Sequence, residues 1–249
     1  EYEKLWMIAR VPRALATRVH AGYEAHVSNN PEILASAQTS MPETAVFEAI
    51  PNGVELPKSV ADDGALRQRL GLSPSDQIVS HVGSFLRAKN QRLLVEAAAR
   101  VPDTHFVFAG GGPQKKHCEA RAAELGLQAR LHFLGPVDDV ATILRGSQVF
   151  AFPSVSEGMP NALLEAMSFA LPSVVTKIPA LTALVRDGEE GHAVEPDPES
   201  FARALRSMLD DDSSRRRLGR AAQRRVETTF SMQVVGERYL ELYRQLCRR

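Results

Sequence analysis

From residue 77 onward, the sequence alternates short apolar runs with segments of helical character, and this alternation limits the possible folds more than any other feature. The runs are rich in Val and Phe and too continuous for strands with one face in water, so we expect buried parallel strands. Strands alternating with helices predict an α/β fold with a doubly wound, Rossmann-like parallel sheet and right-handed crossovers. The expected strands are QIVSHVG (77–83), HFVFAG (105–110), LHFLG (131–135), QVFAFP (148–153), PSVVT (172–176) and GHAVEP (191–196), and the expected helices include QRLLVEAAARV (91–101), PQKKHCEARAAELG (113–126) and NALLEAMSFA (161–170).

Single residues indicate where several helices begin and end. Gly126 and Gly146 fall where a helix end favours a left-handed residue. Residues 212–214, which read Asp-Ser-Ser, are expected to cap an Arg-rich helix. A final helix is expected from near Ser231, with an apolar stripe that needs a surface to pack on. The residues of this stripe are Val235, Tyr239, Leu242 and Leu246.

The first 56 residues have a different pattern. We expect a helical first segment, a strand end at AHVSNN (25–30) and a helix from Pro31. IPNGVELP (50–57) places an Asn-Gly turn between two prolines and predicts a linker or domain crossing. The chain begins with Glu1 and shows no signal-peptide pattern, so we expect a processed or truncated chain.

Composition excludes several classes of function. Net charge is zero and the pI is about 7.3, so nothing indicates a nucleic-acid partner. The two cysteines, Cys118 and Cys247, have neither disulfide-framework nor zinc-site spacing and fit a reducing compartment. No apolar run approaches the roughly 20 residues that span a bilayer. We therefore expect a cytoplasmic protein.

The segment FPSVSEGMPNALLEAM (152–167) holds two glutamates with seven residues between them. Glu157 follows an expected strand and Glu165 belongs to the next helix, but about one such pair is expected by chance in a chain of this length. Its position is more informative, because ligands of open parallel sheets bind at the carboxyl ends of strands. Three loops at that edge suit phosphate: Gly83-Ser84 with Lys89 beyond it, the glycines at 110–112, and residues 156–161.

These residues can be assembled into a site for a nucleoside diphosphate that carries a sugar. The ammonium of Lys89 and the amides of residues 161–163 would hold the diphosphate. Gly158 would let the backbone approach the ligand, and Pro160 suits a first helical turn. The Glu165 carboxylate could accept from both ribose hydroxyls. Glu157, on the loop, would face the sugar.

The chain resembles the C-terminal, donor-binding half of the family 4 retaining glycosyltransferases, which have the GT-B fold. The resemblance covers nearly all of residues 46–249 and rests on six ordered blocks. These blocks are IPNGVEL, VGSFLRAKNQRLLVEAA, FVFAGGGP, HFLGPVDD, VFAFPSVSEGMPNALLEAM and FSMQVVGERYLELYRQL. The resemblance implies a remnant of the N-terminal acceptor domain with its linker at 1–56, a Rossmann-like nucleotide-sugar domain at 57–230, and a helix at 231–249 that packs towards the N-terminal domain.

The resemblance also implies roles for individual residues. Glu157 and Lys89 would be the catalytic residues, and no metal or cofactor would be needed. The leaving phosphate can accept the acceptor's proton, so no separate protein base would be required. The substrate would be a nucleotide-diphosphate sugar such as a UDP- or GDP-sugar, and the acceptor a carbohydrate or a lipid-linked molecule. The donor-binding residues would be Gly83, Ser84, Leu134, Gly135, Val137, Gly158, Met159, Pro160, Asn161, Ala162, Leu163 and Glu165.

The sequence departs from the family pattern in two places. Ser84 stands where the family usually has a phosphate-binding Arg, and loss of a charge-assisted contact costs about 1.5–3 kcal/mol unless Arg87 replaces it. Residues 1–56 also contain no match to the Gly-rich acceptor loop and active-site His of the N-terminal domain. We therefore expect a fragment that binds donor and does not transfer the sugar by itself.

Two other functions remain as alternatives. One is a nucleotide-sugar-binding module without catalysis, in which Ser84 marks a decayed site. The other is a GT-B-fold sugar-nucleotide epimerase, which the block around Glu157 and Glu165 disfavours.

Several motifs also have structural interpretations. The glycines at 110–112 fit a tight turn as well as a phosphate loop. The aspartates at 210–212 fit a helix cap better than a metal site. The arginines of 215–225 fit a solvated face, with contact to anionic lipid at the inner membrane face as the minor alternative. The strand histidines His81, His105 and His132 are expected to be packed or hydrogen-bonded.

Overall fold

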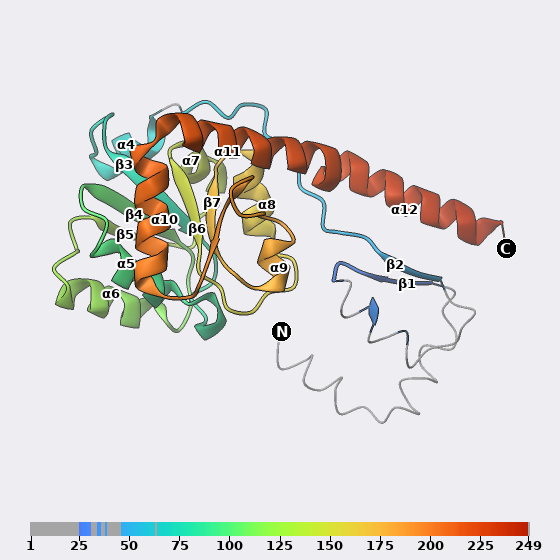
Figure 1. Ribbon diagram of the computed structural model, residues 1–249, viewed down its shortest axis with the longest axis horizontal. Helices are drawn as coiled ribbons and strands as arrows, with labels where there is room; N and C mark the ends of the chain where they lie inside the picture. Colours follow the sequence, from blue (N-terminus) through green and yellow to red (C-terminus); the bar gives the residue numbers. More distant parts are fainter. Residues whose placement is uncertain (1–24, 31–33, 36–37, 39–45, 63, 249) are drawn as a thin grey trace, which may run out of the picture. The chain divides into compact units, whose positions relative to one another are not determined.

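The computed structural model describes residues 25–30, 34–35, 38, 46–62 and 64–248 (Figure 1). The expected helical first segment and the start of the helix expected from Pro31 lie outside these residues. The chain divides into two compact units. The larger is Val54–Met232, and the smaller combines residues before Val54 with those from Gln233 onward.

The larger unit is built on a six-stranded sheet in which every neighbouring pair is parallel, as predicted (Figure 1). The order is β5-β4-β3-β6-β7-β8. Strands β3, β4 and β5 therefore follow one another towards one edge of the sheet, and β6, β7 and β8 follow one another towards the other edge. This is the Rossmann order, and its topological switch point lies between β3 and β6. The strands are β3 (Gln77–Val82), β4 (Thr104–Ala109), β5 (Leu131–Gly135), β6 (Val149–Phe152), β7 (Ser173–Thr176) and β8 (Gly191–Val194).

Helices cover both faces of this sheet, which explains the continuous apolar character of its strands. In β6, Val149 and Ala151 belong to the core cluster formed with α5, α6 and α10, whereas Phe150 and Phe152 belong to the cluster formed with α8. The helices of the unit are α4 (Ala65–Leu70), α5 (Gln91–Ala98), α6 (Lys115–Glu124), α7 (Val140–Arg145), α8 (Asn161–Ser168), α9 (Pro179–Thr182), α10 (Pro198–Asp210) and α11 (Asp212–Arg225), with a 3-10 turn at Arg87–Lys89 and a π-helical turn at Val226–Phe230.

Two of the predicted helix ends need correction. Gly126 is left-handed as expected, with φ 69°, but Gly146 has φ −78° and is not. Glycine at 146 has a packing reason instead, because a Cβ there would lie 2.7 Å from Cβ of Leu66. The N-cap of α11 is Asp211, one residue before the expected segment, and its carboxylate accepts from the Ser214 amide at 2.9 Å.

The smaller unit pairs β1 (Ala25–Ser28) with β2 (Val46–Ala49) in parallel. Its helix α12 (Met232–Cys247), whose first residue belongs to the larger unit, carries the apolar stripe foreseen from the sequence. Val235 and Leu242 are buried with Ile50, and Tyr239 and Leu246 pack around them. Among the described residues, no helix has both the length and the apolar character needed to cross a bilayer.

Candidate functional site

The loops that follow β3 and β6 meet at the switch point of the sheet. Lys89 ends the 3-10 turn after β3, and Glu157 lies in the loop after β6. The Lys89 Nζ is 2.5 Å from Oε1 of Glu157, and the two side chains are 22% and 8% exposed. The structure therefore brings together two predicted site residues as a largely buried ion pair.

Backbone contacts hold these two loops together. The carbonyl of Ala88 accepts from the Val155 amide at 2.8 Å and lies 2.9 Å from the Ser154 hydroxyl oxygen. Asn90 has a left-handed φ of 51°, which turns the chain from the 3-10 turn into α5. The position of Lys89 relative to Glu157 is thus fixed by main-chain bonds as well as by charge.

Two further residues contact the ion pair, and the sequence analysis did not single them out. The Ser154 Oγ lies 2.5 Å from the same Oε1 of Glu157. The Lys89 ammonium also lies over the ring of buried Phe152, 5.4 Å from its centroid, where a cation is attracted to the ring face. Both residues lie in the segment 152–167 that contains the two glutamates. The position of Ser154, three residues before Glu157, is the sequence feature that could have indicated its contact with the carboxylate.

The glycines at 110–112 bring the loop after β4 against the loop after β3. Gly110 has φ 137°, and a Cβ there would lie 2.1 Å from the Gly83 carbonyl oxygen. Gly112 has φ 143°, and its Cβ would lie 2.7 Å from the Phe85 carbonyl oxygen. Close backbone approach therefore accounts for both glycines, which supports the tight-turn interpretation.

The N-terminus of α8 lies immediately beyond Glu157. Pro160 is the extended N-cap and not part of the first helical turn, so the helix begins at Asn161. The amide of Leu163 donates to the Pro160 carbonyl at 3.2 Å, which engages one of the three amides expected to face a diphosphate. A Cβ at Gly158 would meet no described atom within 4 Å, whereas Met159 packs against the α8 cluster.

Glu165 is a half-buried carboxylate one turn into α8. Burial raises its pKa, because the charged form loses hydration. Among the described residues, no group donates a hydrogen bond to this carboxylate and no cation pairs with it. A ligand with hydroxyl donors would satisfy it.

His81 joins β3 to the neighbouring strand and loop. Its Nδ1 lies 2.9 Å from the Ala151 carbonyl oxygen, which can only accept, so Nδ1 carries the hydrogen and Nε2 accepts from the Gln91 amide at 3.2 Å. Gln91 also donates to the Ser84 carbonyl at 2.8 Å. Burial lowers the pKa of His81 to about 4, so it is neutral at physiological pH.

His105 and His132, the other two histidines considered in the sequence analysis, are hydrogen-bonded to each other. His105 Nδ1 lies 3.0 Å from His132 Nε2, and burial together with His105 lowers the pKa of His132. This agrees with the expectation for all three strand histidines. Over the part of the chain that the structure describes, no group of three or more His, Cys, Asp or Glu side chains could hold a metal ion.

The remaining predicted donor-binding residues follow β3 and β5. The Gly83 amide donates to the Ala109 carbonyl at 2.9 Å, and the side chain of Ser84 is exposed. The Gly135 carbonyl accepts from the Gly110 amide at 2.7 Å. Leu134 and Val137 pack against the core cluster on α4 and α7. These positions lie at or just beyond the carboxyl ends of β3 and β5, the edge at which open parallel sheets bind their ligands.

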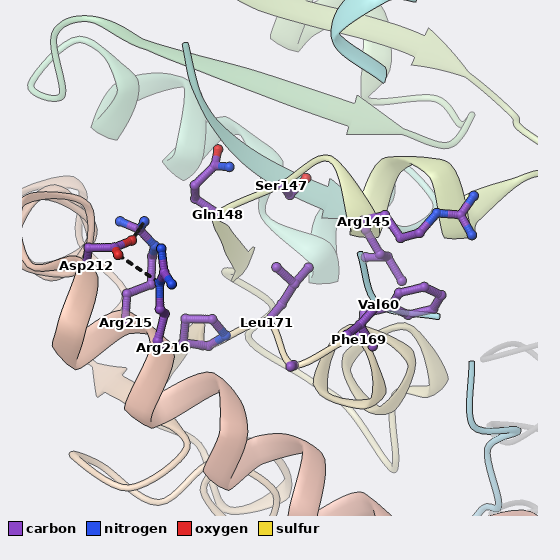
Figure 2. A pocket seen from close by; sticks show the side chains of 12 residues that line it. Val60, Arg145, Ser147, Gln148, Phe169, Leu171, Asp212, Arg215 and Arg216 are labelled. Atoms are coloured by element: carbon purple, nitrogen blue, oxygen red, sulfur yellow. Dashed lines mark hydrogen bonds and ion pairs between the residues drawn. The ribbon is translucent and has the colours of Figure 1, made fainter. Parts of the chain in front are cut away.

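A separate cavity of about 260 Å³ lies near the opposite edge of the sheet (Figure 2). Its lining includes Gln148 and Pro172, which precede β6 and β7 and so mark the amino ends of those strands. Figure 2 shows Asp212 bound to both Arg215 and Arg216 at its rim. The cavity is distinct from the Lys89–Glu157 site.

Comparison with known proteins gives a family match. The model of the family described as "Glycosyl transferases group 1" matches residues 62–225. The lipopolysaccharide core biosynthesis glycosyltransferase LpsE of Rhizobium meliloti is 31% identical over 177 residues, which cover 71% of this chain and 52% of that protein. The UDP-Gal:alpha-D-GlcNAc-diphosphoundecaprenol alpha-1,3-galactosyltransferase of Escherichia coli is 36% identical over 176 residues, covering 66% and 46%. The chain thus spans about half the length of these relatives.

Solved structures with the same fold extend the comparison. The sucrose-phosphate synthase of Thermosynechococcus elongatus aligns with a TM-score of 0.82 at 25% identity, covering 96% of this chain and 63% of that one. HepE of Anabaena, in complex with UDP and glucose, aligns with a TM-score of 0.83 at 20% identity, covering 94% and 66%. The expected α/β fold with a parallel sheet is confirmed.

Proposed function

This chain belongs to the glycosyl transferases group 1 family, and from that premise we propose that it supplies the donor-binding half of a retaining hexosyltransferase. The observation that carries the proposal is the Lys89–Glu157 pair at the topological switch point, next to the start of α8 and Glu165. A cation, a helix N-terminus and a carboxylate that lacks a described donor match the diphosphate and ribose of a nucleotide sugar.

The donor is a nucleotide-diphosphate sugar, and a UDP-sugar is the first to test. The name of the Escherichia coli relative includes UDP-Gal, and the HepE structure contains UDP and glucose. Glu165 accepts from the ribose, Lys89 and the start of α8 hold the diphosphate, and Glu157 faces the sugar. The backbone near Leu134, Gly135 and Val137 borders the base.

The reaction moves the sugar to an acceptor hydroxyl. The bond between the anomeric carbon and the diphosphate oxygen breaks, and its electron pair leaves with the diphosphate. The acceptor oxygen bonds to the anomeric carbon on the same face, and its proton passes to the departing phosphate oxygen. Lys89 and the N-terminal dipole of α8 stabilise the negative charge that develops on the leaving group. The absence of a cofactor requirement is a prediction that follows from this scheme.

The acceptor is a carbohydrate or a lipid-linked molecule, as the names of the relatives suggest for those proteins. An acceptor domain outside the larger unit completes the enzyme, in keeping with the half-length coverage of the relatives. The isolated chain therefore binds donor without transferring the sugar.

Contact with a membrane surface is a separate part of the proposal. Arg216, Arg220 and Arg224 repeat every four residues along α11 and are exposed. Among the described residues, Arg220 and Arg224 have no carboxylate partner. Binding to vesicles that contain anionic lipid, and its loss in the Arg220→Gln/Arg224→Gln variant, tests this contact.

Turnover by the chain joined to an N-terminal domain tests the enzymatic proposal. Glu157→Gln and Lys89→Ala should each abolish sugar transfer, whereas Lys115→Ala, in a partly exposed i,i+4 pair on α6, should not. Retention of transfer by the two site variants would refute the assignment. Donor binding without any transfer would favour a binding module, and release of an epimerised sugar nucleotide would favour an epimerase.

A further inference from the structure

We propose that Ser154 is a positioning residue that holds Glu157 in place when Lys89 moves from this carboxylate to the diphosphate of the donor. The inference rests on the proposed function, because it requires a diphosphate at Lys89. It adds Ser154 to the site, and it adds a step in which Lys89 exchanges one anion for another. The two anions that compete for the Lys89 ammonium are the Glu157 carboxylate and the diphosphate of the ligand.

The competition follows from the geometry of the ion pair. The ammonium assigned to the diphosphate lies 2.5 Å from Oε1 of Glu157. A diphosphate that approaches Lys89 meets a carboxylate of the same sign of charge, so the two anions compete for the ammonium. Binding of the donor therefore weakens the bond between Lys89 and Glu157.

Loss of that bond would leave the Glu157 carboxylate nearly buried and without a cation to neutralise its charge. Its side chain is 8% exposed, and Lys89 is its only ion-pair partner among the residues that the structure describes. A nearly buried carboxylate without a partner carries a large desolvation penalty. A second donor that remains in place lowers this penalty and makes the exchange easier.

Ser154 has the geometry of that second donor. Its Oγ lies 2.5 Å from Oε1 of Glu157 and 2.9 Å from the Ala88 carbonyl oxygen. A hydroxyl has one hydrogen to donate, and the Ala88 carbonyl already accepts from the Val155 amide at 2.8 Å. The hydrogen therefore goes to the charged acceptor at the shorter distance. Ser154 is fully buried two residues after β6, so its hydroxyl stays in place when the long side chain of Lys89 moves.

Two consequences distinguish this role from a structural one. In Ser154→Ala, Glu157 depends on Lys89 alone, so the diphosphate displaces it less easily and binds more weakly. In Glu157→Gln, the internal anion is gone, so UDP, which carries no sugar, binds at least as tightly as to the wild type. In that background the Ser154 hydroxyl has no carboxylate to hold.

Calorimetric titration of the 249-residue chain with UDP tests the proposal through a double-mutant cycle of Ser154→Ala and Glu157→Gln. We expect Ser154→Ala alone to raise the Kd about tenfold, as for a hydrogen bond to a charged group. In the Glu157→Gln background the same change should alter the Kd by less than about twofold. Ser147→Ala is the matched control, because Ser147 is also buried and donates to a backbone carbonyl, that of Ile143, at 2.6 Å; its Kd should equal that of the wild type.

The other outcomes are also informative. Equal weakening by Ser154→Ala in both backgrounds, or no weakening in either, overturns the positioning role while UDP binding by the wild type leaves the proposed function intact. If the wild type binds none of UDP, GDP or ADP, the proposed function fails and this inference fails with it. Thermal unfolding of each variant shows whether a lost affinity comes from a lost fold.

Discussion

Lys89 and Glu157 are 68 positions apart in the sequence, yet their side chains are joined at 2.5 Å where the strand order of the sheet reverses. The pair is largely buried, and the loops that carry it are tied by the Ala88 carbonyl. This relationship places a cation and a carboxylate at the edge where open parallel sheets bind their ligands.

The ion pair should contribute to stability in a way that exposed pairs do not. We expect Lys89→Ala to lower the free energy of unfolding by about 1–3 kcal/mol, between the ranges of exposed and buried pairs, because it leaves Glu157 without its cation. Adding Glu157→Gln should recover part of that loss. Lys115→Ala, in a more exposed pair with Glu119, should cost less than about 0.5 kcal/mol. Urea unfolding of the wild type, the two single variants and the Lys89→Ala/Glu157→Gln double variant measures these free energies. An equal loss of stability in Lys89→Ala and Lys115→Ala would argue against a buried Lys89–Glu157 pair.

Glu165 should lower the stability of the chain without ligand. Its pKa is raised, so the folded state binds more protons than the unfolded state between the two pKa values, and stability falls as pH rises through that window. Above it, Glu165→Gln should be more stable than the wild type, with a rise in Tm of about 2–4 °C per kcal/mol for this chain length. Differential scanning calorimetry at pH 7 measures the change. A lower Tm for the variant would show that a bond, and not burial, dominates at this carboxylate.

Substitution by alanine should destabilise the protein strongly at one loop glycine, Gly110, and hardly at all at another, Gly158. Gly110→Ala forces a positive φ and a 2.1 Å approach to the Gly83 carbonyl, so we expect it to cost more than about 2 kcal/mol or to prevent folding. Gly158→Ala meets no described atom within 4 Å, and the free energy of unfolding should change by less than about 0.5 kcal/mol. Urea denaturation compares the two. A tolerant Gly110 would mean that the two loops separate easily.

His81 should make the protein less stable in mild acid. Its pKa is about 4 in the folded chain, below the ordinary histidine value of 6.5, because burial disfavours the charged ring. As pH falls from about 6.5 towards 4, the unfolded chain binds a proton that the folded chain does not, so stability is lost over that window. At pH 7 this loss is absent.

The slope of stability against pH for His81→Gln tests that origin, because glutamine does not titrate. The urea midpoint of the variant should change less between pH 7 and pH 5 than that of the wild type. The same change in both proteins would assign the acid sensitivity to other groups.

The sequence predicted the sheet well because parallel strands buried on both faces leave a strong apolar signal. All six strands of the larger sheet were located. The residue types in the loops after those strands indicated Lys89, Glu157 and Glu165 as candidate site residues. Two errors concerned helix ends: Gly146 avoids a tertiary clash with Leu66 and does not turn the chain, and Pro160 precedes α8 by one residue and does not enter it. The role of Ser154 depends on the short distance between its hydroxyl and the Glu157 carboxylate, which a spacing of three residues permits but does not fix.

The central claim is that this chain binds the nucleoside diphosphate of a sugar donor through Glu165 and Lys89. Calorimetric titration with UDP, GDP and ADP, repeated on Glu165→Ala, tests it most directly. We predict that one of the three nucleotides binds and that Glu165→Ala weakens this binding at least tenfold, as expected for loss of hydrogen bonds to a charged group. Binding that Glu165→Ala leaves unchanged, or no binding by any of the three nucleotides, would contradict the claim.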